Sequence, residues 1–377
     1  MRLFAPATEA EAAGIVRAHP RIGLAIAGGG TRMVNHRNPA LSARSLCGVR
    51  RYRPQDMTMT AAAGTPLSAI EEVLASHGQR LGFEPTSAIA GRSTIGAVAA
   101  MNLSGPRRPF AGSARDALLG LRMVTGLGER VSTGGRVIKN AAGLDLTRAI
   151  AGSFGSLAFI TEVTFRTMPV PAAGINVVLP GMRASMLPAV AARLMLKGLP
   201  LTGAAHLDGV GLGGVAGAGP VALLRFEGSA SAVAAAKRHL DSLDLAVAVH
   251  DGGDPWGIVA RATVLAPGAG QALWRVTIPE TAGGALAEQL AREGADVLTD
   301  RRGGLLRLRH GVDFARRLAA LVAPMPGASA SLEAGPPRAA ILPDHNQPGA
   351  AMLARLKQAL DPNAVFVAAN RPGAAAA

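Results

Sequence analysis

The chain has 377 residues, of which 49% are hydrophobic and only 17% are charged, and these values predict a folded protein with room for two domains. The net charge of +14 comes almost entirely from scattered arginines, and aromatic residues make up only 3%, so we expect no nucleic acid as a partner. The single cysteine, Cys47, excludes an internal disulfide and a cysteine-rich metal site, and we expect no bound metal.

No stretch of the sequence predicts a transmembrane segment. The most apolar stretch, residues 210–224, contains Pro220 and many glycines, and its length of about fifteen residues is below the roughly twenty that span a bilayer. The N-terminal stretch contains acidic residues where a secretory signal would need an apolar core. We therefore expect a cytoplasmic protein.

Strands and helices alternate over the first 171 residues. A strand rich in β-branched and aromatic residues is expected over 157–167, and it stops at Pro169 and Pro171, which predicts a domain boundary. The other elements expected here are a helix over 9–19, strands over 22–27 and 57–63, a helix over 66–77, and a strand and hairpin over 118–131.

The pattern changes between residues 175 and 335. Strand–helix pairs in succession predict a small α+β domain, a sheet with helices on one face, and no internal repeat is evident. An amphipathic helix with Leu353, Leu356 and Leu360 follows near the C-terminus. The expected strands of the middle part are 221–227, 272–278 and 304–309, and its expected helices are 230–240, 285–292 and 312–322.

The first segment that indicates chemistry is residues 26–33, IAGGGTRM. A strand that ends in Gly28, Gly29 and Gly30 leaves backbone N–H groups free to face an anion such as pyrophosphate. The segment is not GxGxxG, and no acidic residue follows about twenty positions later, so a Rossmann dinucleotide site is disfavoured. Taken alone, an ordinary tight turn is the simpler interpretation.

Two further segments are rich in small residues. In residues 91–109, GRSTIGAVAAMNLSGPRRP, Ser93 or Thr94 can cap a helix of small side chains, which lets a planar ligand lie against the backbone and favours negative charge. In residues 134–171, a loop of Gly and Ala leads through Asp145 into a short helix and a strand. Close helix–sheet packing and an ordinary strand connection stay open as alternatives.

The order and spacing of these segments resemble the FAD-binding domain of the PCMH/vanillyl-alcohol-oxidase superfamily. The resemblance implies an α+β fold class: a two-subdomain PCMH-type FAD-binding domain over 1–171, then a smaller ferredoxin-like cap domain over 175–335. Residues 336–377, a C-terminal helix and tail, are expected to return to the FAD domain. The motifs that match are the turn ending in Thr31, Ala63-Gly64-Thr65-Pro66-Leu67, Asn102, Ser104-Gly105, Gly112 to Asp116, and Gly152 to Leu157.

The resemblance also implies where FAD would bind. The pyrophosphate is expected over Gly28 to Thr31, and the flavin ring near Thr94 to Ala97 and Asn102. Covalent members place a His or Cys beside the flavin, whereas His36 lies beyond Thr31, so FAD is expected to be non-covalent. The expected cofactor-binding residues are Gly28, Gly29, Gly30, Thr31, Arg32, Thr94, Gly96, Ala97, Asn102, Gly105, Gly112, Asp116 and Ile160.

A narrower resemblance is to the FAD-binding subunit of bacterial glycolate oxidases. The sequence departs from it in three places: Ala97 and Leu144 replace the usual Gly and Tyr, and residues 366–370 replace the terminal Phe-Asn-Pro-Gly-Arg pattern. The segments that carry the resemblance are Ser104 to Arg108, Val137 to Leu146, Leu273-Trp274-Arg275 and Leu360-Asp361-Pro362-Asn363.

This narrower resemblance implies a subunit that supports oxidation of glycolate, or another small 2-hydroxy acid, to glyoxylate. The implied partners are a larger catalytic flavin subunit and an iron–sulfur subunit, through which the chain could attach peripherally to the inner membrane. A self-sufficient FAD-dependent 2-hydroxy-acid dehydrogenase and a flavin-free scaffold subunit stay open as alternatives.

The sequence identifies no catalytic residue. The eight histidines stand alone, so none forms the His-x-His pair of the related catalytic subunits. Arg275 and Arg307 are candidate cations for a substrate carboxylate, and each is equally well interpreted as the solvent end of a strand.

Overall fold

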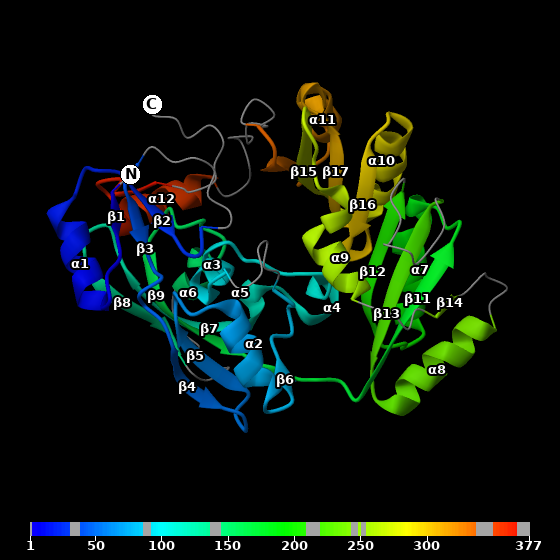
Figure 1. The fold of residues 1–377 in the computed structure, drawn as a ribbon, viewed down its shortest axis with the longest axis horizontal. Coiled ribbons are helices and arrows are strands. Elements are labelled where there is room, and N and C mark those ends of the chain that lie inside the picture. The colour runs from blue at the N-terminus through cyan, green and yellow to red at the C-terminus, as the bar shows by residue number, and fades with distance from the viewer. Residues whose placement is uncertain are drawn as a thin grey trace. The chain divides into compact units, whose positions relative to one another are not determined.

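The computed structural model describes residues 2–30, 38–85, 92–135, 145–208, 219–242, 248–249, 254–336 and 350–367. The chain forms two compact units, whose elements can be followed by colour in Figure 1. The first unit comprises residues 1–105, 112–170 and 346–377, and the second comprises residues 106–111 and 171–345. In the described part of the chain, no helix is long and apolar enough to cross a membrane.

The first unit contains a five-stranded antiparallel sheet and a four-stranded parallel sheet. The antiparallel sheet has the order β4 (Val49–Arg53), β5 (Thr58–Ala62), β9 (Phe159–Arg166), β7 (Leu118–Val124) and β8 (Arg130–Gly134). The parallel sheet has the order β1 (Leu3–Phe4), β3 (Ala40–Ser42), β2 (Leu24–Ala27) and β19 (Phe366–Val367). A two-stranded pair joins β6 (Gln79–Arg80) and β10 (Met168–Pro169).

Short helices pack on these sheets around a single hydrophobic core. The six-residue helix α3 buries Ile95, Val98 and Ala99, whereas Ala97 and Ala100 on its other side are only half-buried. Its small side chains therefore face open space, which positions the site described below. The helices are α1 (Glu9–Ala18), α2 (Leu67–Ala75), α3 (Ile95–Ala100), α5 (Ala114–Ala117), α6 (Leu146–Ile150) and α12 (Ala350–Leu360).

The second unit is built on one eight-stranded antiparallel sheet with the order β14-β11-β13-β12-β16-β17-β15-β18. The strands are β11 (Ala173–Pro180), β12 (Leu201–Asp208), β13 (Val221–Gly228), β14 (Ala248–Val249), β15 (Gln271–Thr277), β16 (Asp296–Asp300), β17 (Leu305–Gly311) and β18 (Ser329–Ala334). Each half of the sheet follows the chain order strand, helix, strand, strand, helix, strand, which is the ferredoxin-like order.

The expectation of no internal repeat is wrong at the level of topology. The two halves have the same arrangement of strands and meet where β12 pairs with β16. The repeat is hard to detect in the sequence because a strand needs only apolar side chains on alternate positions, and many residue combinations satisfy that need. For example, β13 reads VALLRFEG and the corresponding β17 reads LLRLRHG.

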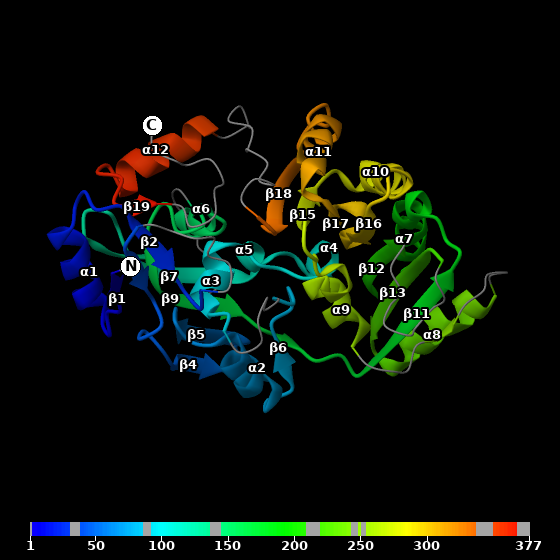
Figure 2. The same ribbon diagram turned by 45° about the horizontal axis from the view of Figure 1, so that its top comes forward.

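Helices cover both faces of this sheet (Figure 2). Val177 and Leu179 share a core with α7 (Leu187–Leu196) and α8 (Ala230–Asp241), whereas Val178 shares a core with Trp256 of α9 (Pro255–Arg261) on the opposite face. α10 (Glu280–Arg292) and α11 (Ala315–Val322) cover the second half, and α4 (Arg108–Ala111) lies against β12. Short 3₁₀ turns occupy Ala184–Met186, Thr263–Leu265, Arg301–Gly303 and Val312–Phe314.

Candidate functional site

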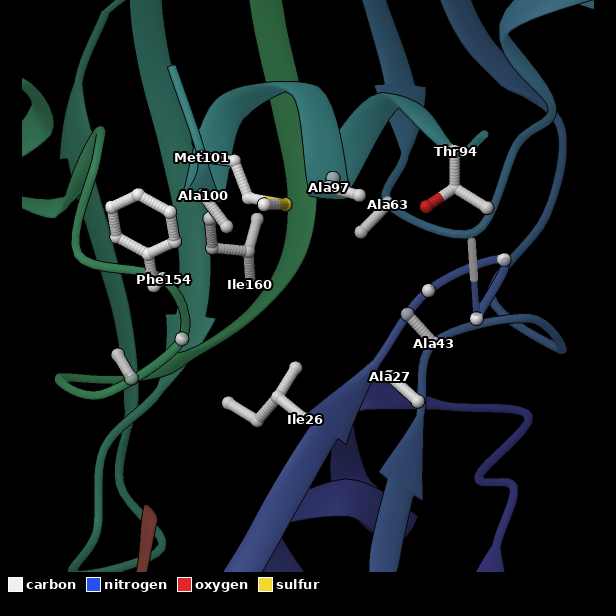
Figure 3. A pocket seen from close by; sticks show the side chains of 16 residues that line it. Ile26, Ala27, Ala43, Ala63, Thr94, Ala97, Ala100, Met101, Phe154 and Ile160 are labelled. Carbon is white, nitrogen blue, oxygen red and sulfur yellow. The ribbon is translucent and has the colours of Figure 1, made fainter. Parts of the chain in front are cut away.

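A cavity lies in the first unit at the end of β2 (Figure 3). Its walls come from the turn after β2, from Thr94 and the half-buried side of α3, and from the loop before β9. The space between these walls, including open solvent at its mouth, is about 680 Å³. Among the described residues that line it, Thr94 has the only polar side chain.

The cavity brings together residues that are far apart in the sequence. Several residues that were not assigned to the cofactor also line it, although three of them, Ala63, Phe154 and Gly155, lie inside matching motifs. The expected residues that line it are Gly28, Gly29, Gly30, Thr94, Gly96, Ala97 and Ile160. The unexpected ones are Ile26, Ala27, Ala43, Ala63, Ala100, Met101, Phe154, Gly155 and Ala158. Small alanines scattered along a sequence give no signal of such a role.

The glycines of the turn are needed for close packing against the segment that leads into α3. A Cβ on Gly29 would overlap the carbonyl oxygen of Arg92, and a Cβ on Gly28 would lie 2.5 Å from Thr94 Oγ1. Gly30 has a φ of +70°, which residues with side chains rarely adopt. The sequence suggested only access for a phosphate; the structure adds a reason for glycine that is independent of any ligand.

Thr94 carries a buried hydroxyl without a partner. The residue is 3% exposed, and its Oγ1 has no hydrogen bond within the described part of the chain. It stands at the N-cap position of α3 but makes no capping bond with its side chain. An unsatisfied buried polar group costs about 1–3 kcal/mol, so a polar ligand atom in the cavity would recover that cost.

Two other expected residues do not line the cavity and have protein partners instead. Asn102 Oδ1 accepts a hydrogen bond from the Arg115 amide at 2.9 Å. Asp116 Oδ2 accepts from the amide and the hydroxyl of Ser113, both at 2.8 Å, and these bonds lower the pKa of Asp116, the amide most of all. The Asn102 bond therefore joins the segments on the two sides of residues 106–111, and the Asp116 bonds fix the turn that follows them.

The expected glycines at 105 and 112 also lie outside the cavity lining. A Cβ on Gly105 would overlap the carbonyl oxygen of Glu84, and Gly112 has a φ of +81°. These backbone requirements explain glycine at both positions without a ligand. Thr31 and Arg32 lie outside the described residues, so their expected contacts with the cofactor stay a prediction.

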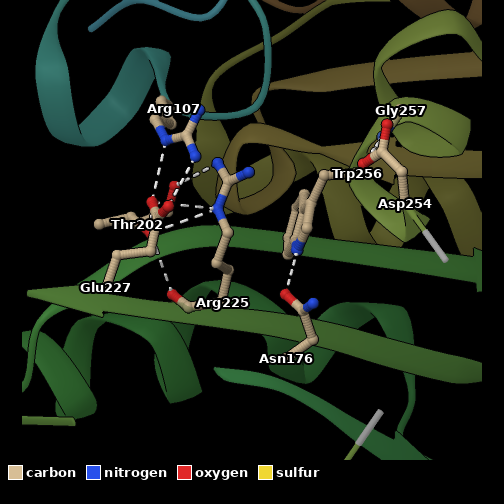
Figure 4. Close-up of polar contacts among 8 residues, drawn as sticks. All are labelled: Arg107, Asn176, Thr202, Arg225, Glu227, Asp254, Trp256 and Gly257. Atoms are coloured by element: carbon tan, nitrogen blue, oxygen red, sulfur yellow. Dashed lines mark hydrogen bonds and ion pairs between the residues drawn. The ribbon is translucent and has the colours of Figure 1, made fainter. Parts of the chain in front are cut away.

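A network of buried charges lies on the α9 side of the second unit's sheet (Figure 4). Arg107 donates from Nε to Glu227 Oε2 at 2.9 Å and from Nη2 to Oε1 at 2.7 Å, and Thr202 donates to the same carboxylate at 2.7 Å. Arg225 stacks over the ring of Trp256, with 4.5 Å to the centroid. Because Arg107 belongs to residues 106–111, this network accounts for the place of that segment in the second unit.

The indole of Trp256 is fixed on two sides. Its Nε1 donates to Asn176 Oδ1 at 2.7 Å, and a Cβ on Gly203 would come within 2.6 Å of the ring (Figure 4). Asp254 caps α9 by accepting a hydrogen bond from the Gly257 amide at 2.8 Å. The network therefore has a fixed geometry that depends on pairs of residues from distant parts of the sequence.

Of the two candidate cations, Arg307 is not the solvent end of a strand. It is 3% exposed, donates from Nε to Glu333 Oε2 at 2.8 Å, and donates from Nη1 to the carbonyl of Val259 at 3.2 Å. Arg275 pairs with Arg307 across β15 and β17 and is half-buried. Neither residue lines the cavity of the first unit.

The described titratable groups offer no base beside the cavity. None of the residues that line it titrates. His206 in the second unit is buried, donates from Nε2 to the carbonyl of Met182 at 2.7 Å, and has its pKa lowered by burial, which fits a neutral structural histidine. Within the described ranges, no three His, Cys, Asp or Glu side chains are grouped to hold a metal ion.

Comparison with known families identifies the first unit. Residues 2–134 match a family model described as an FAD binding domain. Over these residues the chain is similar to FAD-binding domains of the PCMH type, as its motifs implied. The expected cofactor, FAD, is therefore confirmed, and the residues of this domain include most of the cavity wall.

The individual relatives of the chain include two glycolate oxidase subunits and a 2-hydroxy-acid dehydrogenase. The chain is 33% identical to glycolate oxidase subunit GlcE of Escherichia coli over 244 residues, or 64% of each protein, so it spans slightly less than two thirds of that relative. It is 34% identical to D-2-hydroxyglutarate dehydrogenase of Xanthomonas citri over 33% of this chain and 26% of the relative. It is 33% identical to glycolate oxidase subunit GlcD of Bacillus subtilis over 30% of this chain and 24% of the relative. The expected resemblance to glycolate oxidase subunits and FAD-linked oxidoreductases is confirmed.

A solved structure shows the same fold over nearly the whole chain. Alkyldihydroxyacetonephosphate synthase aligns with a TM-score of 0.67 at 17% identity, covering 96% of this chain and 76% of that one. The expected α+β class with a PCMH-type domain is therefore confirmed. At this identity the likeness concerns the fold alone.

Proposed function

We propose that this chain is the FAD-binding subunit of a glycolate oxidase or dehydrogenase complex and holds FAD non-covalently. The observation that carries the proposal is the cavity, in which a glycine turn, a row of small residues and one unpartnered hydroxyl face the same space. The similarity to GlcE over 64% of the chain supports the glycolate assignment.

The residues of the cavity fit the parts of FAD. Gly28 to Gly30 carry no side chains that would exclude phosphate oxygens, and their amides can donate to them. Gly96, Ala97 and Ala100 leave room for a flat ring system, and Thr94 Oγ1 supplies a polar contact. When bound, FAD would supply a redox group that can accept electrons and pass them on.

Non-covalent attachment agrees with the chemistry of the cavity wall. Among the described residues that line it there is neither His nor Cys, the side chains that form covalent links to flavin. Cys47, the single cysteine of the chain, is exposed and is not one of the lining residues.

We further propose that residues 1–171 form the FAD-binding domain, residues 175–335 the cap domain, and residues 336–377 a segment that returns to the FAD-binding domain. The pairing of β19 with β2 supports the return of the C-terminus. The ferredoxin-like order of each half of the second unit supports the cap assignment.

Partner subunits complete the proposed activity. Oxidation of glycolate to glyoxylate removes two electrons and two protons, which requires a group that accepts a proton. No titratable side chain lines the described cavity, so we assign substrate oxidation to a larger catalytic flavin subunit and onward electron transfer to an iron–sulfur subunit. The chain would be cytoplasmic, or peripheral at the inner membrane through these partners.

The test is glycolate-dependent dye reduction by the purified chain loaded with FAD, alone and after co-expression with the two partner subunits. We expect negligible reduction by the chain alone, with activity and a co-purifying complex after co-expression. Rapid bleaching of the flavin by glycolate in the isolated chain would contradict the proposal and favour a self-sufficient dehydrogenase. Failure to bind FAD would instead favour a scaffold subunit.

A further inference from the structure

Lys357 and Asp361 form an ion pair at the end of α12. This helix lies close to β19 (Figure 2). The side chain of Asp361 is fully buried, and both of its oxygens have partners. Oδ1 accepts from the Val365 amide and Oδ2 from the Phe366 amide, both at 2.8 Å, and Lys357 also donates to Oδ2. A buried carboxylate with charged and backbone donors fixes the position of the chain around it.

The Asp361 side of this pair holds the strand next to the glycine turn. The Leu24 amide donates to the carbonyl of Val365 at 2.6 Å, and β19 pairs with β2 in parallel through Phe366 and Leu24. β2 continues directly into Gly28. The carboxylate therefore fixes, through two backbone amides, the strand that carries one wall of the cavity.

Lys357 holds a second wall of the cavity, the loop before β9. Its ammonium group donates to the carbonyl of Ser156 at 2.7 Å and to that of Phe366 at 2.8 Å, so with Asp361 all three of its protons are used. Ser156 directly follows Phe154 and Gly155, which line the cavity. Lys357 thus joins the loop before β9 to β19 in one polar cluster.

The two walls also contact each other. A Cβ on Gly155 would lie 3.1 Å from Cβ of Ile26 on β2, and Ile26 lines the cavity as well. A Cβ on Gly126, in the turn between β7 and β8, would overlap the Asp361 carboxylate. The ion pair therefore lies where three chain segments meet, and its removal would affect the segments that form the cavity.

We propose that Lys357 and Asp361 are positioning residues for the cofactor. Neither lines the cavity, so they act through the backbone: they set the separation between the turn after β2 and the loop at residues 153–156. The cofactor's identity here rests on the proposed function, whereas the positioning of the two walls does not.

The first test needs no flavin. Lys357→Met removes the ammonium group, and Arg355→Met removes an exposed cation from the same helix as a control. We expect faster amide hydrogen exchange in Lys357→Met at residues 24–30 and 153–157, with α2 (residues 67–75) unchanged, and no change in Arg355→Met. Equal exchange in the parent and Lys357→Met would overturn the proposal, and so would acceleration spread evenly over the first unit.

The second test measures FAD affinity by titration of the full chain. Loss of charge-assisted bonds at the walls should weaken FAD binding by about tenfold or more in Lys357→Met and alter the visible circular dichroism of bound flavin. Lys357→Arg, which keeps the charge and donors, should recover most of the affinity, and Arg355→Met should match the parent. Unchanged affinity in Lys357→Met would count against the proposal, whereas a parent that binds no FAD would defeat the proposed function and leave the exchange result decisive.

Discussion

The two units differ in how their interior is built: the first uses small residues around a cavity, and the second uses arginine–carboxylate pairs. The first unit builds its cavity from residues with little or no side chain, so that backbone packs against backbone at Gly29 and Gly96. The second unit uses buried or half-buried arginines matched to carboxylates, such as Arg307 with Glu333 and Arg107 with Glu227. The first arrangement leaves space for a ligand, whereas the second fills its space with charge and hydrogen bonds.

This contrast can be tested separately in each unit because the probes do not overlap. Both tryptophans of the chain, Trp256 and Trp274, lie in the second unit, so intrinsic tryptophan fluorescence reports on that unit. Bound flavin would report on the first unit. Each variant below can therefore be assigned to the unit that it changes.

The largest effect is expected from breaking the buried pair of the second unit. Arg107→Met removes the bidentate partner of the Glu227 carboxylate but leaves Thr202 and, at 3.5 Å, Arg225 beside it, so the cost should lie below the about 3–5 kcal/mol of breaking a fully buried pair. Denaturant unfolding followed by tryptophan fluorescence should show the loss. Arg183→Met, which removes an exposed partner of Glu288, serves as the control and should leave the midpoint nearly unchanged. Equal midpoints for the two variants would contradict the role given to Arg107.

The next effect concerns the space in the first unit. Ala97→Leu adds a branched side chain to the half-buried wall of the cavity, beside Gly28. Filling the space should weaken FAD binding by about 100-fold, comparable to the cost of overpacking a fitted site. Ala69→Leu, a half-buried position on α2 away from the cavity, is the matched control. FAD affinity equal to that of the control would place the cofactor elsewhere.

Gly29→Val is a poorer test of the same space. Its side chain would overlap the Arg92 carbonyl, so it would disrupt the turn whether or not a phosphate lies there.

A smaller effect is expected at Thr94, where loss of the hydroxyl should raise the stability of the flavin-free protein and lower its affinity for FAD. Thr94→Val keeps the shape but removes the unpartnered hydroxyl, so the flavin-free protein should become more stable by about 1 kcal/mol. The same change should weaken FAD binding by about tenfold, because one polar contact is lost. Thermal unfolding without FAD measures the change in stability, and titration with FAD measures the change in affinity. A loss of stability without FAD would show that the hydroxyl has a partner in the protein.

The smallest effect is a pH dependence in the second unit. Bonds from Arg183 and Ser185 lower the pKa of Glu288 from 4.5 to about 2. Its contribution is fully present above pH 4.5 and is lost as the pH falls towards 2, because the unfolded chain takes up the proton first. Glu288→Gln should therefore be less stable than the parent at pH 6, by at most about 1 kcal/mol for a pair exposed to solvent, and equal near pH 2. A constant difference across this range would exclude Glu288 as its source.

The sequence predicted the first unit better than the second for a physical reason. Gly28 to Gly30 and Gly96 are short-range signals, since glycine marks close approach by residue type alone. Arg107 and Glu227 are separated by 120 positions, and nothing local to either indicates the other. The doubled topology of the second unit was missed for a similar reason, because alternation of apolar residues does not specify which strands pair.

The sequence also could not show why glycine is required at each of these positions. Gly105 and Gly112 were assigned to the cofactor, yet the structure explains them by a backbone contact and a positive φ. Asn102 and Asp116 similarly have hydrogen bonds within the protein that hold their own loop. A motif shared with a family thus combines residues that line the cavity with residues that shape the chain around it, and only the fold separates the two groups.

The most direct test of the central claim is titration of the flavin-free chain with FAD, followed by acid precipitation. We predict a perturbed flavin spectrum that saturates at one FAD per chain, with all of the flavin released into the supernatant by acid. Addition of FAD without any spectral change, or flavin that stays with the precipitated protein, would contradict non-covalent binding of FAD in this cavity.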